Sequence, residues 1–433
     1  MTKSDIHILF ILLLLMIPSW VFAGEIHVAP EGPVHTLREA LRIAHDGDHI
    51  FLGTGTYREG TITVTKSVWI SGEGHPVLDG EHKYEILQIK ADHVIVAGIT
   101  FINTGMSYVQ DNAAIKVFHA HDVTIRNNHL RNNFFGIYLA KTEHSVVSGN
   151  EIIANGTRET SSGNGIHLWD CRDITVENNR TVGNRDGIYF EFVKKGMIRN
   201  NVSSKNIRYG LHFMYSDSCS YINNRFVDNG AGVAVMFTHR VDMENNYFGH
   251  NRGANAYGLL LKEIYDSKIL RNVFDENSTG LYAESSNRLN VKYNDFTQNG
   301  WAVKIMASSQ GGVFRHNNFT DNTFDVTTNS FQNTNTFEEN YWSAYQGYDL
   351  NRNGFGDIPY RPVRLFAVVV SQQPTSLILL RSLFVQVLDV AEKVFPVLTP
   401  ETLIDSKPLM KPYHDTTGAV GQIVRYTAGT EGY

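Results

Sequence analysis

The sequence predicts an all-β protein that folds as a right-handed parallel β-helix, a solenoid whose chain winds through a repeat of about 22 residues. Three markers recur in phase, at spacings of 22 to 29 residues. The first is a glycine followed by alternating apolar residues, at Gly136, Gly165, Gly187, Gly210, Gly232, Gly258 and Gly280. The second is an asparagine near the middle of each repeat, at Asn150, Asn179, Asn201, Asn224, Asn246, Asn272 and Asn294. The third closes each repeat, at Asn155, Asn184, Asn206, Asn229, Asn251, Asn277 and Asn299.

The chemistry of each repeat explains why this period indicates stacked coils. Short runs with period-2 alternation, such as 137–139 and 174–176, are too short to bury a face alone. Stacking gives each strand two parallel neighbours and joins the inward aliphatic side chains into one core. Asparagine and glycine tolerate the left-handed backbone of the corners. The longer spacings predict loops at about 156–162 and 253–255.

Composition narrows the class of protein. Of the 433 residues, 11% are aromatic and 19% are charged, which is typical of a folded, sheet-rich chain rather than a disordered one. The formal net charge of −6 and the absence of a basic run argue against a general nucleic-acid binder.

The N-terminal segment 1–23 is predicted to be a secretory signal peptide. Lys3 precedes an apolar run at 8–17, and the small or medium side chains of Val21 and Ala23 occupy the positions that a signal peptidase reads. Cleavage before Gly24 is expected, since the run is short for a membrane span. An uncleaved anchor is the alternative.

The two cysteines of this exported chain are expected to be free thiols. Cys171 and Cys219 occupy different places in their repeats, two coils apart. Two coils separate residues by roughly 10 Å, because neighbouring strands lie about 4.8 Å apart. A disulfide cannot span that distance.

The β-helix is expected to extend over 24–345 and to need capped ends, because an open end is an exposed sheet edge. Residues 36–44 have the pattern of a short amphipathic helix with Thr36 as its N-cap. We assign this helix as the N-terminal cap.

The segment 346–362, which follows the last repeat, is a possible calcium loop. Asp349, Asn351, Asn353 and Asp357 stand at positions 1, 3, 5 and 9 of the loop, and a glycine stands at position 6. This is the oxygen-ligand spacing of a calcium loop, although Tyr360 stands where a bidentate glutamate is usual. A plain turn rich in aspartate and asparagine is the alternative.

The segment 363–410 is predicted to be an apolar helical extension that docks on a partner. Pro374 can start a helix that runs to about Phe395 and is apolar on most sides. Such a helix needs a partner, which we expect to be associated with a membrane. The proposed docking residues are Leu377, Leu380, Phe384, Leu388 and Phe395. The tail at 411–433 is polar and is expected to be flexible.

The outward-facing positions of the coils contain a candidate metal patch. The second and fourth residues after each marker glycine point outward, which places His212 and Met214 on one outer face. Met236 lies one coil from Met214, and His239 follows three residues later. Thioether and imidazole are soft ligands that suit Cu(I). The sequence therefore predicts either a transient copper contact or a hydrophobic protein-binding ladder without metal.

An exported polysaccharide lyase or epimerase acting on acidic sugars is an alternative class of function. Such sites need paired carboxylates, or carboxylates that bind calcium beside a basic residue. The outward carboxylates, such as Asp170 and Asp217, fall at different positions of their repeats. The run 119–122, His-Ala-His-Asp, is only loosely similar to the catalytic motif of alginate epimerases, because the leading aspartate is missing. Structural roles in turns are favoured, and no catalytic residue is assigned. A surface adhesin or sugar-binding solenoid is a third reading.

Several segments together resemble the NosD family, which comprises periplasmic maturation proteins for the copper enzyme nitrous oxide reductase. The segments are the signal peptide, the Asn-Gly coils, the run 340–343 (Asn-Tyr-Trp-Ser), the loop 349–360 and the apolar end 363–408. The resemblance covers nearly the whole mature chain. The coils are shared with many β-helix proteins, so the part from 340 to 408 is the discriminating one.

The resemblance implies a periplasmic, non-enzymatic scaffold for copper-site assembly in denitrification. NosD-like proteins act with an ABC-type transporter, a lipoprotein copper chaperone and the apo-reductase. The helix after Pro374 would then dock on the membrane subunit of the transporter and hold the protein near the inner membrane. The outer face of the coils would receive the chaperone or the reductase.

Overall fold

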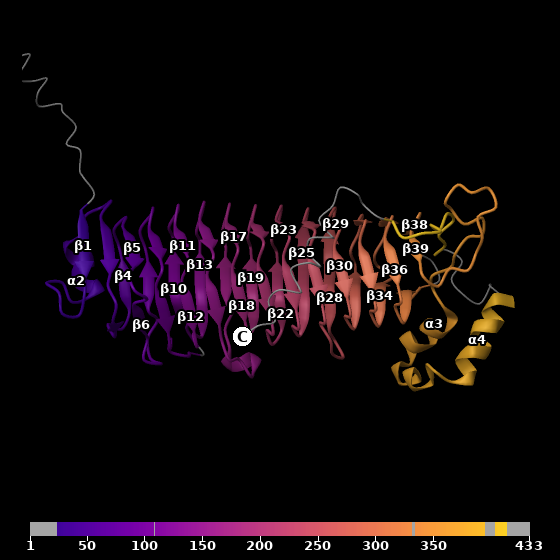
Figure 1. Ribbon diagram of the computed structural model, residues 1–433, viewed down its shortest axis with the longest axis horizontal. Helices are drawn as coiled ribbons and strands as arrows, with labels where there is room; N and C mark the ends of the chain where they lie inside the picture. The colour runs from indigo at the N-terminus through magenta and orange to yellow at the C-terminus, as the bar shows by residue number, and fades with distance from the viewer. Residues whose placement is uncertain (1–23, 108, 331–333, 395–402, 414–433) are drawn as a thin grey trace, which may run out of the picture.

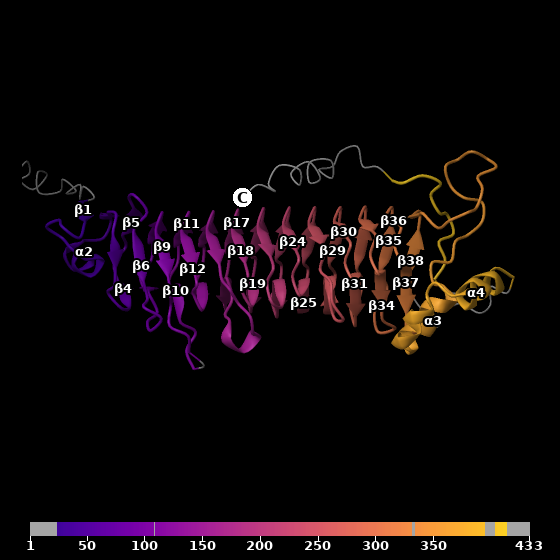
Figure 2. The same ribbon diagram turned by 60° about the horizontal axis from the view of Figure 1, so that its bottom comes forward.

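The computed structural model describes residues 24–107, 109–330, 334–394 and 403–413 and shows an elongated parallel β-helix (Figures 1 and 2). The predicted signal peptide and the tail beyond Tyr413 lie outside the described residues. The described strands form three sheets that run along the rod, and every paired strand is parallel to its neighbour. The predicted fold class is confirmed.

Successive coils contribute one strand to each sheet in turn. The first sheet contains β1 (Glu25–Val28), β2 (His49–Leu52), β5 (Trp69–Gly72), β8 (Ile95–Ala97), β11 (Thr124–Arg126), β14 (Val146–Ser148), β17 (Thr175–Glu177), β20 (Met197–Arg199), β23 (Ser220–Ile222), β26 (Asp242–Glu244), β29 (Lys268–Leu270), β32 (Asn290–Lys292), β35 (Val313–Arg315) and β38 (Thr336–Glu338). The second sheet contains β4 (Ile62–Val64), β7 (Leu87–Ile89), β10 (Ala113–Phe118), β13 (Phe135–Ala140), β16 (Ile166–Trp169), β19 (Asp186–Glu191), β22 (Tyr209–Met214), β25 (Ala231–His239), β28 (Tyr257–Tyr265), β31 (Thr279–Glu284), β34 (Trp301–Ile305) and β37 (Phe324–Thr328). The third sheet contains β3 (Thr56–Tyr57), β6 (Val77–Asp79), β9 (Thr100–Ile102), β12 (His129–Arg131), β15 (Glu151–Ile153), β18 (Arg180–Val182), β21 (Val202–Ser204), β24 (Arg225–Val227), β27 (Tyr247–Gly249), β30 (Val273–Asp275), β33 (Asp295–Thr297), β36 (Asn318–Thr320) and β39 (Tyr341–Trp342).

The side chains that point into the rod form one continuous core. The first and third residues after each marker glycine, such as Leu211 and Phe213 in β22, are fully buried, as the alternation predicts. Phenylalanine rings also stack from coil to coil with centroid separations of 4.1 to 5.6 Å. The stack runs through Phe226, Phe248, Phe274, Phe296, Phe319 and Trp342.

Buried asparagines join the coils through side-chain hydrogen bonds. In the second-marker column, the Nδ2 of each asparagine donates to the Oδ1 of the next at 2.9 to 3.1 Å, from Asn128 to Asn340. The same oxygens accept the backbone N–H groups of the preceding asparagines, so buried polar groups at the corner are satisfied. The asparagine period that predicted the fold is therefore also a source of its stability.

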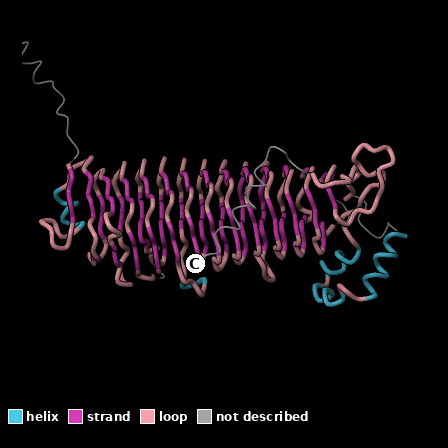
Figure 3. Tube along the Cα trace, viewed as in Figure 1, coloured by secondary structure: helices cyan, strands magenta, loops and turns pink. Residues whose placement is uncertain are grey.

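Both ends of the rod are covered (Figure 3). Helix α2 (Leu37–Ile43) lies at the N-terminal end, and the Thr36 hydroxyl accepts a hydrogen bond from the Glu39 N–H, as predicted for a capped helix. The loop predicted at 156–162 contains a short 3₁₀ helix, η1 (Glu159–Ser161). The thiols of Cys171 and Cys219 are free and buried.

The C-terminal helices differ from the single helix predicted from Pro374 to Phe395. The structure contains α3 (Leu365–Gln372), the 3₁₀ helix η2 (Pro374–Leu379) and α4 (Leu383–Val394). Gln373 leaves the helical region at φ −134° and ψ 85°, because the residue before a proline disfavours α-helical geometry. Phe395 lies outside the described residues. No helix within the described ranges is long and apolar enough to cross a bilayer.

The segment 403–413 was expected to belong partly to the docking extension, but it returns to the end of the β-helix. Asp405 is fully buried there and accepts hydrogen bonds from the backbone N–H of Asn340 and from the indole of Trp342. The N–H of Leu409 donates to the carbonyl of Asn340. This segment therefore covers the last coil, and the helical part of the extension within the described residues is 365–394.

Candidate functional site

The two candidate methionines lie side by side on the outer face of the second sheet. Met214 in β22 and Met236 in β25 are directly paired in the parallel register, so their side chains stand on adjacent coils. Glu191 in β19 precedes them and Lys262 in β28 follows them in the same column. Both methionine side chains are partly exposed. The strand register therefore places the two thioether side chains next to each other, as the sequence predicts.

His212 was expected to be an exposed member of this face, and the structure shows its ring covered. The side chain points outward but is only 5% exposed, because the rings of Tyr189 and Tyr209 pack on it at 4.8 and 4.7 Å. Neither ring nitrogen has a hydrogen-bond partner, and Nδ1 lies 3.8 Å from the Asp186 carboxylate. A buried imidazole without partners retains a free lone pair in its neutral form.

An ion pair lies behind His212. The Arg208 guanidinium donates to both oxygens of Asp186, and the Tyr209 N–H donates to Oδ1 at 3.2 Å. Burial opposes ionisation of Asp186, but the hydrogen bonds and charge of Arg208, together with the nearby His212, hold its pKa below the usual range. The carboxylate is therefore ionised, and it lies 3.8 Å from His212 Nδ1.

Tyr189 connects the histidine to the methionines. Its ring packs on His212, and its hydroxyl donates a hydrogen bond to Met214 Sδ at 3.4 Å. Burial raises the pKa of Tyr189 to about 12, so the hydroxyl keeps its proton as a donor. A copper ion bound by Met214 would compete with this weak hydrogen bond for the same sulfur lone pairs.

His239 is separated from the methionine pair by a corner. Phe237, between Met236 and His239, has a φ of +56°, which bends β25 before its last residue, His239. The His239 ring bonds Asp217 at 3.2 Å and stacks on Tyr265 at 5.2 Å. Its contacts are therefore made around the corner from the two thioethers.

The corner beside the methionines also has an exposed aromatic stack that sequence reasoning did not identify. The rings of Phe192, Tyr215 and Phe237 lie nearly parallel, at 5.3 and 5.1 Å. All three residues have left-handed backbones with φ from 50° to 57°, which is unusual for aromatic residues. The side chains of Phe192 and Tyr215 are 44% and 45% exposed. Other coils place polar residues at this position, and that contrast was the signal available in the sequence.

The predicted docking residues are divided between two environments. Leu380 and Leu388 pack against a small apolar cluster that α3 and α4 form on Phe324 of the last coil. Leu377 and Phe384 are 44% and 50% exposed. The exposed apolar surface of this extension is completed by Ile378, Leu383, Val387 and Val390.

The Asp349 loop forms a turn held by its own hydrogen bonds. Asp349 accepts from the N–H groups of Asn353 and Gly354, at 3.1 and 2.9 Å. Asp357 accepts from the Leu350 N–H at 2.7 Å and from the amide of Asn351 at 3.3 Å. The four predicted oxygen ligands thus belong to one compact loop. Calcium binding there stays a prediction.

Comparisons with known proteins agree with this architecture. The family model described as "Periplasmic copper-binding protein (NosD)" matches residues 155–347, and the model "Right handed beta helix region" matches residues 63–189. The "Probable ABC transporter binding protein NosD" of Stutzerimonas stutzeri is 27% identical over 415 residues, which is 90% of this chain and 92% of that protein. The protein of the same description from Pseudomonas aeruginosa is 27% identical over 402 residues, 86% of this chain and 91% of that protein.

Solved structures that share the fold include enzymes. The catalytic unit of a GH87 α-1,3-glucanase from Streptomyces thermodiastaticus gives a TM-score of 0.55 at 13% identity, covering 75% of this chain and 67% of that one. The A-module of the mannuronan C-5 epimerase AlgE6 from Azotobacter vinelandii gives 0.51 at 14% identity, covering 70% and 86%. At these identities the likeness concerns the fold alone.

Proposed function

We propose that this chain, which matches the NosD family model over residues 155–347 and is 27% identical to a NosD protein over 90% of its length, is a periplasmic accessory protein for copper-site assembly of nitrous oxide reductase. It acts without catalysing a reaction of its own, together with an ABC-type transporter and a copper chaperone. The similarity to a family described as periplasmic and to relatives described as ABC transporter binding proteins supports this location and a transporter partner.

The observation that carries this proposal is the pairing of Met214 with Met236 on adjacent coils. Two partly exposed thioethers on neighbouring strands lie within reach of one ion, since the strands are about 4.8 Å apart. Thioether sulfur is a soft donor and favours Cu(I) over the divalent ions that compete for oxygen and nitrogen. His212 supplies an imidazole without hydrogen-bond partners two residues from Met214.

This donor set is suited to passing copper on. Two thioethers on an open face leave the ion accessible to a second protein, so a chaperone or the reductase can exchange ligands with it. The His212 ring becomes a third ligand only if it moves away from Tyr189 and Tyr209, which cover it. His239, at the end of the strand that contains Met236, contributes only if it leaves Asp217.

The exposed aromatic stack extends the same surface into a docking site. Phe192, Tyr215 and Phe237 lie directly after Glu191, Met214 and Met236 in the chain. Aromatic residues and methionine are enriched at the energetic centres of protein interfaces. We assign this surface to the copper chaperone, whose metal would then be delivered next to the two thioethers.

The extension 365–394 docks on the membrane subunit of the transporter. Its outward residues, including Leu377 and Phe384, form an exposed apolar surface at one end of the rod (Figure 1). Water-exposed apolar patches of this kind mark sites of association. The rod would thus be held by its C-terminal end while the methionine pair stays free along its side.

Deletion of the coding sequence in a denitrifying host tests the proposal. The reductase should be exported but should lack copper at its catalytic site, and expression of the intact chain should restore it. Normal copper loading in the deletion strain would overturn the proposal. No observation favours the lyase or epimerase alternative, and turnover of alginate or pectate by the purified protein would support it instead.

A further inference from the structure

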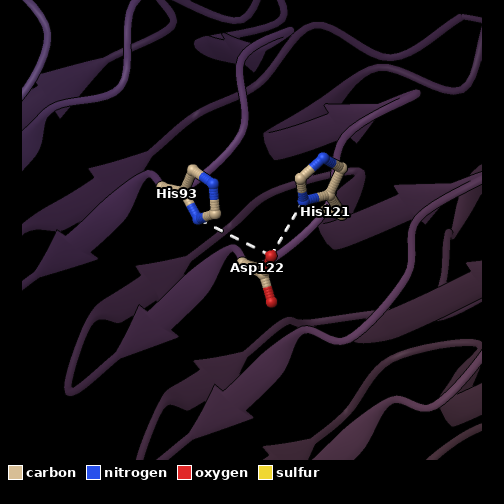
Figure 4. Close-up of side chains that lie close together, drawn as sticks. All are labelled: His93, His121 and Asp122. Atoms are coloured by element: carbon tan, nitrogen blue, oxygen red, sulfur yellow. Dashed lines mark hydrogen bonds and ion pairs between the residues drawn. The ribbon is translucent and has the colours of Figure 1, made fainter.

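A second cluster of ligand-type side chains, drawn in Figure 4, lies in the coils that contain β7 to β11. His93 lies between β7 and β8, whereas His121 and Asp122 lie between β10 and β11, one coil later. All three occupy the corner between the second and first sheets, where stacking makes residues 28 or 29 positions apart into neighbours. The cluster is solvent-exposed and is remote in sequence from Met214 and Met236.

The atoms of this cluster converge on one point. Asp122 Oδ2 lies 2.8 Å from His121 Nδ1 and 3.6 Å from His93 Nδ1, and the three candidate ligand atoms lie within 4.8 Å of one another. A metal ion with bonds of about 2.1 Å to nitrogen and oxygen places adjacent ligand atoms roughly 3.0 to 3.4 Å apart. Small rotations of the side chains therefore bring all three atoms to coordinating distance.

Asp92 holds His121 in the orientation that such a site needs. Its Oδ2 lies 2.9 Å from His121 Nε2, and its Oδ1 accepts the backbone N–H of His121 at 2.9 Å. Histidines that bind metals commonly donate their second ring N–H to a carboxylate, which fixes the tautomer and makes the ligating nitrogen more basic. Asp92 therefore fixes the backbone of His121 and lies beside Nε2, while Nδ1 of His121 is turned toward Asp122.

We propose that His93, His121 and Asp122 bind a divalent first-row transition-metal ion, with Asp92 as a positioning residue for His121. Two imidazoles and one carboxylate are borderline and hard donors, which suit Zn²⁺, Cu²⁺ or Ni²⁺ rather than Cu⁺. The three ligands approach from one side, so water completes the coordination. In chemistry and position this site differs from the methionine pair, and it does not depend on the proposed function.

Metal titration of the full mature chain tests the inference. Zn²⁺ is followed by calorimetry, and Co²⁺ by its visible absorption. His93→Asn and Asp122→Asn keep residues that tolerate the left-handed backbone of this corner, where φ is +56° and +57°. Each should weaken binding at least tenfold, and Asp92→Asn should weaken it by about 10 to 100-fold.

Two controls separate this site from others in the chain. His144→Asn changes the next histidine of the same corner, whose ring faces Asp173 at 3.7 Å, and should leave affinity unchanged. The double variant Met214→Leu/Met236→Leu should also bind Zn²⁺ and Co²⁺ as the parent does. The inference is overturned if the parent binds neither ion, or if His93→Asn and Asp122→Asn bind like His144→Asn.

Discussion

Replacing Asp405 should strongly destabilise the C-terminal end of the rod. The carboxylate is fully buried and terminates the asparagine column, accepting from the N–H groups of Glu339 and Asn340 and from Trp342 Nε1 at 2.9 to 3.1 Å. Asp405→Ala leaves these three donors without their acceptor. Each unsatisfied buried group costs about 1 to 3 kcal/mol, and water that enters the site satisfies some of the donors. The free energy of unfolding should therefore fall by about 4 kcal/mol.

The loss is local because the segment 403–413 contacts the last coils and the neighbouring loop 346–362. When it detaches, β38 and β39, the last strands of the first and third sheets, become exposed edges. Urea unfolding followed by tryptophan fluorescence reports the change, since Trp342 is only 1% exposed in the native protein. Limited proteolysis should locate the first cleavage in or next to 403–413.

Lys407→Ala is the matched control, because it removes an exposed ion pair with Glu338 from the same segment. Its cost should be below about 1 kcal/mol. If Asp405→Ala costs no more than Lys407→Ala, the carboxylate does not anchor this segment and the argument for the C-terminal cap is wrong.

Three further predictions concern the extension, the last coil and the Asp349 loop. Leu377→Ser/Phe384→Ser should weaken association with the transporter at least fivefold and change the melting temperature little. Val313→Ser, which changes an exposed apolar residue on β35, is the control and should leave both the association and the melting temperature unchanged. Equal binding of the parent and the two variants would refute the docking surface. Burial raises the pKa of Asp325 to about 6, above its unfolded value of 3.8. The free energy of unfolding should therefore fall by about 2 to 3 kcal/mol as pH rises from about 4 to about 7. Asp325→Asn should abolish this loss, and a variant with the same dependence of stability on pH as the parent would contradict the prediction. If the Asp349 loop binds calcium, a chelator should lower the melting temperature of the parent but not of Asp349→Asn, and identical melts of the parent with and without chelator would exclude a stabilising ion.

The fold could be predicted because its stabilising interactions are written into the sequence at regular intervals. The marker asparagines bond to their counterparts one coil away, and the residues after each marker glycine alternate between core and surface. Both features require the same register in every coil. Three columns in phase therefore specify which residues become neighbours, including Met214 and Met236.

The parts that could not be predicted depend on neighbours that the repeat does not fix. Alternation showed that His212 points outward, but its burial depends on the size of Tyr189 and Tyr209 beside it. The run 119–122 stood out in the sequence, but its proximity to His93 could not be predicted because the early coils lack the regular markers that set the register.

The C-terminal segment shows the same limit. The return of Asp405 to the last coil joins residues 65 positions apart without any periodic signal. The structural role of its carboxylate becomes visible only when the positions of the N–H groups of Glu339 and Asn340 are known.

The copper content of the reductase in cells that express Met214→Leu/Met236→Leu tests the central claim most directly. Leucine keeps the bulk of methionine and removes the sulfur, so the β-helix should fold unchanged. Met197→Leu removes an exposed methionine from the first sheet and serves as the control. The account predicts a copper-poor reductase with the double variant and a fully loaded one with Met197→Leu. Full loading with both would contradict copper contact at this pair.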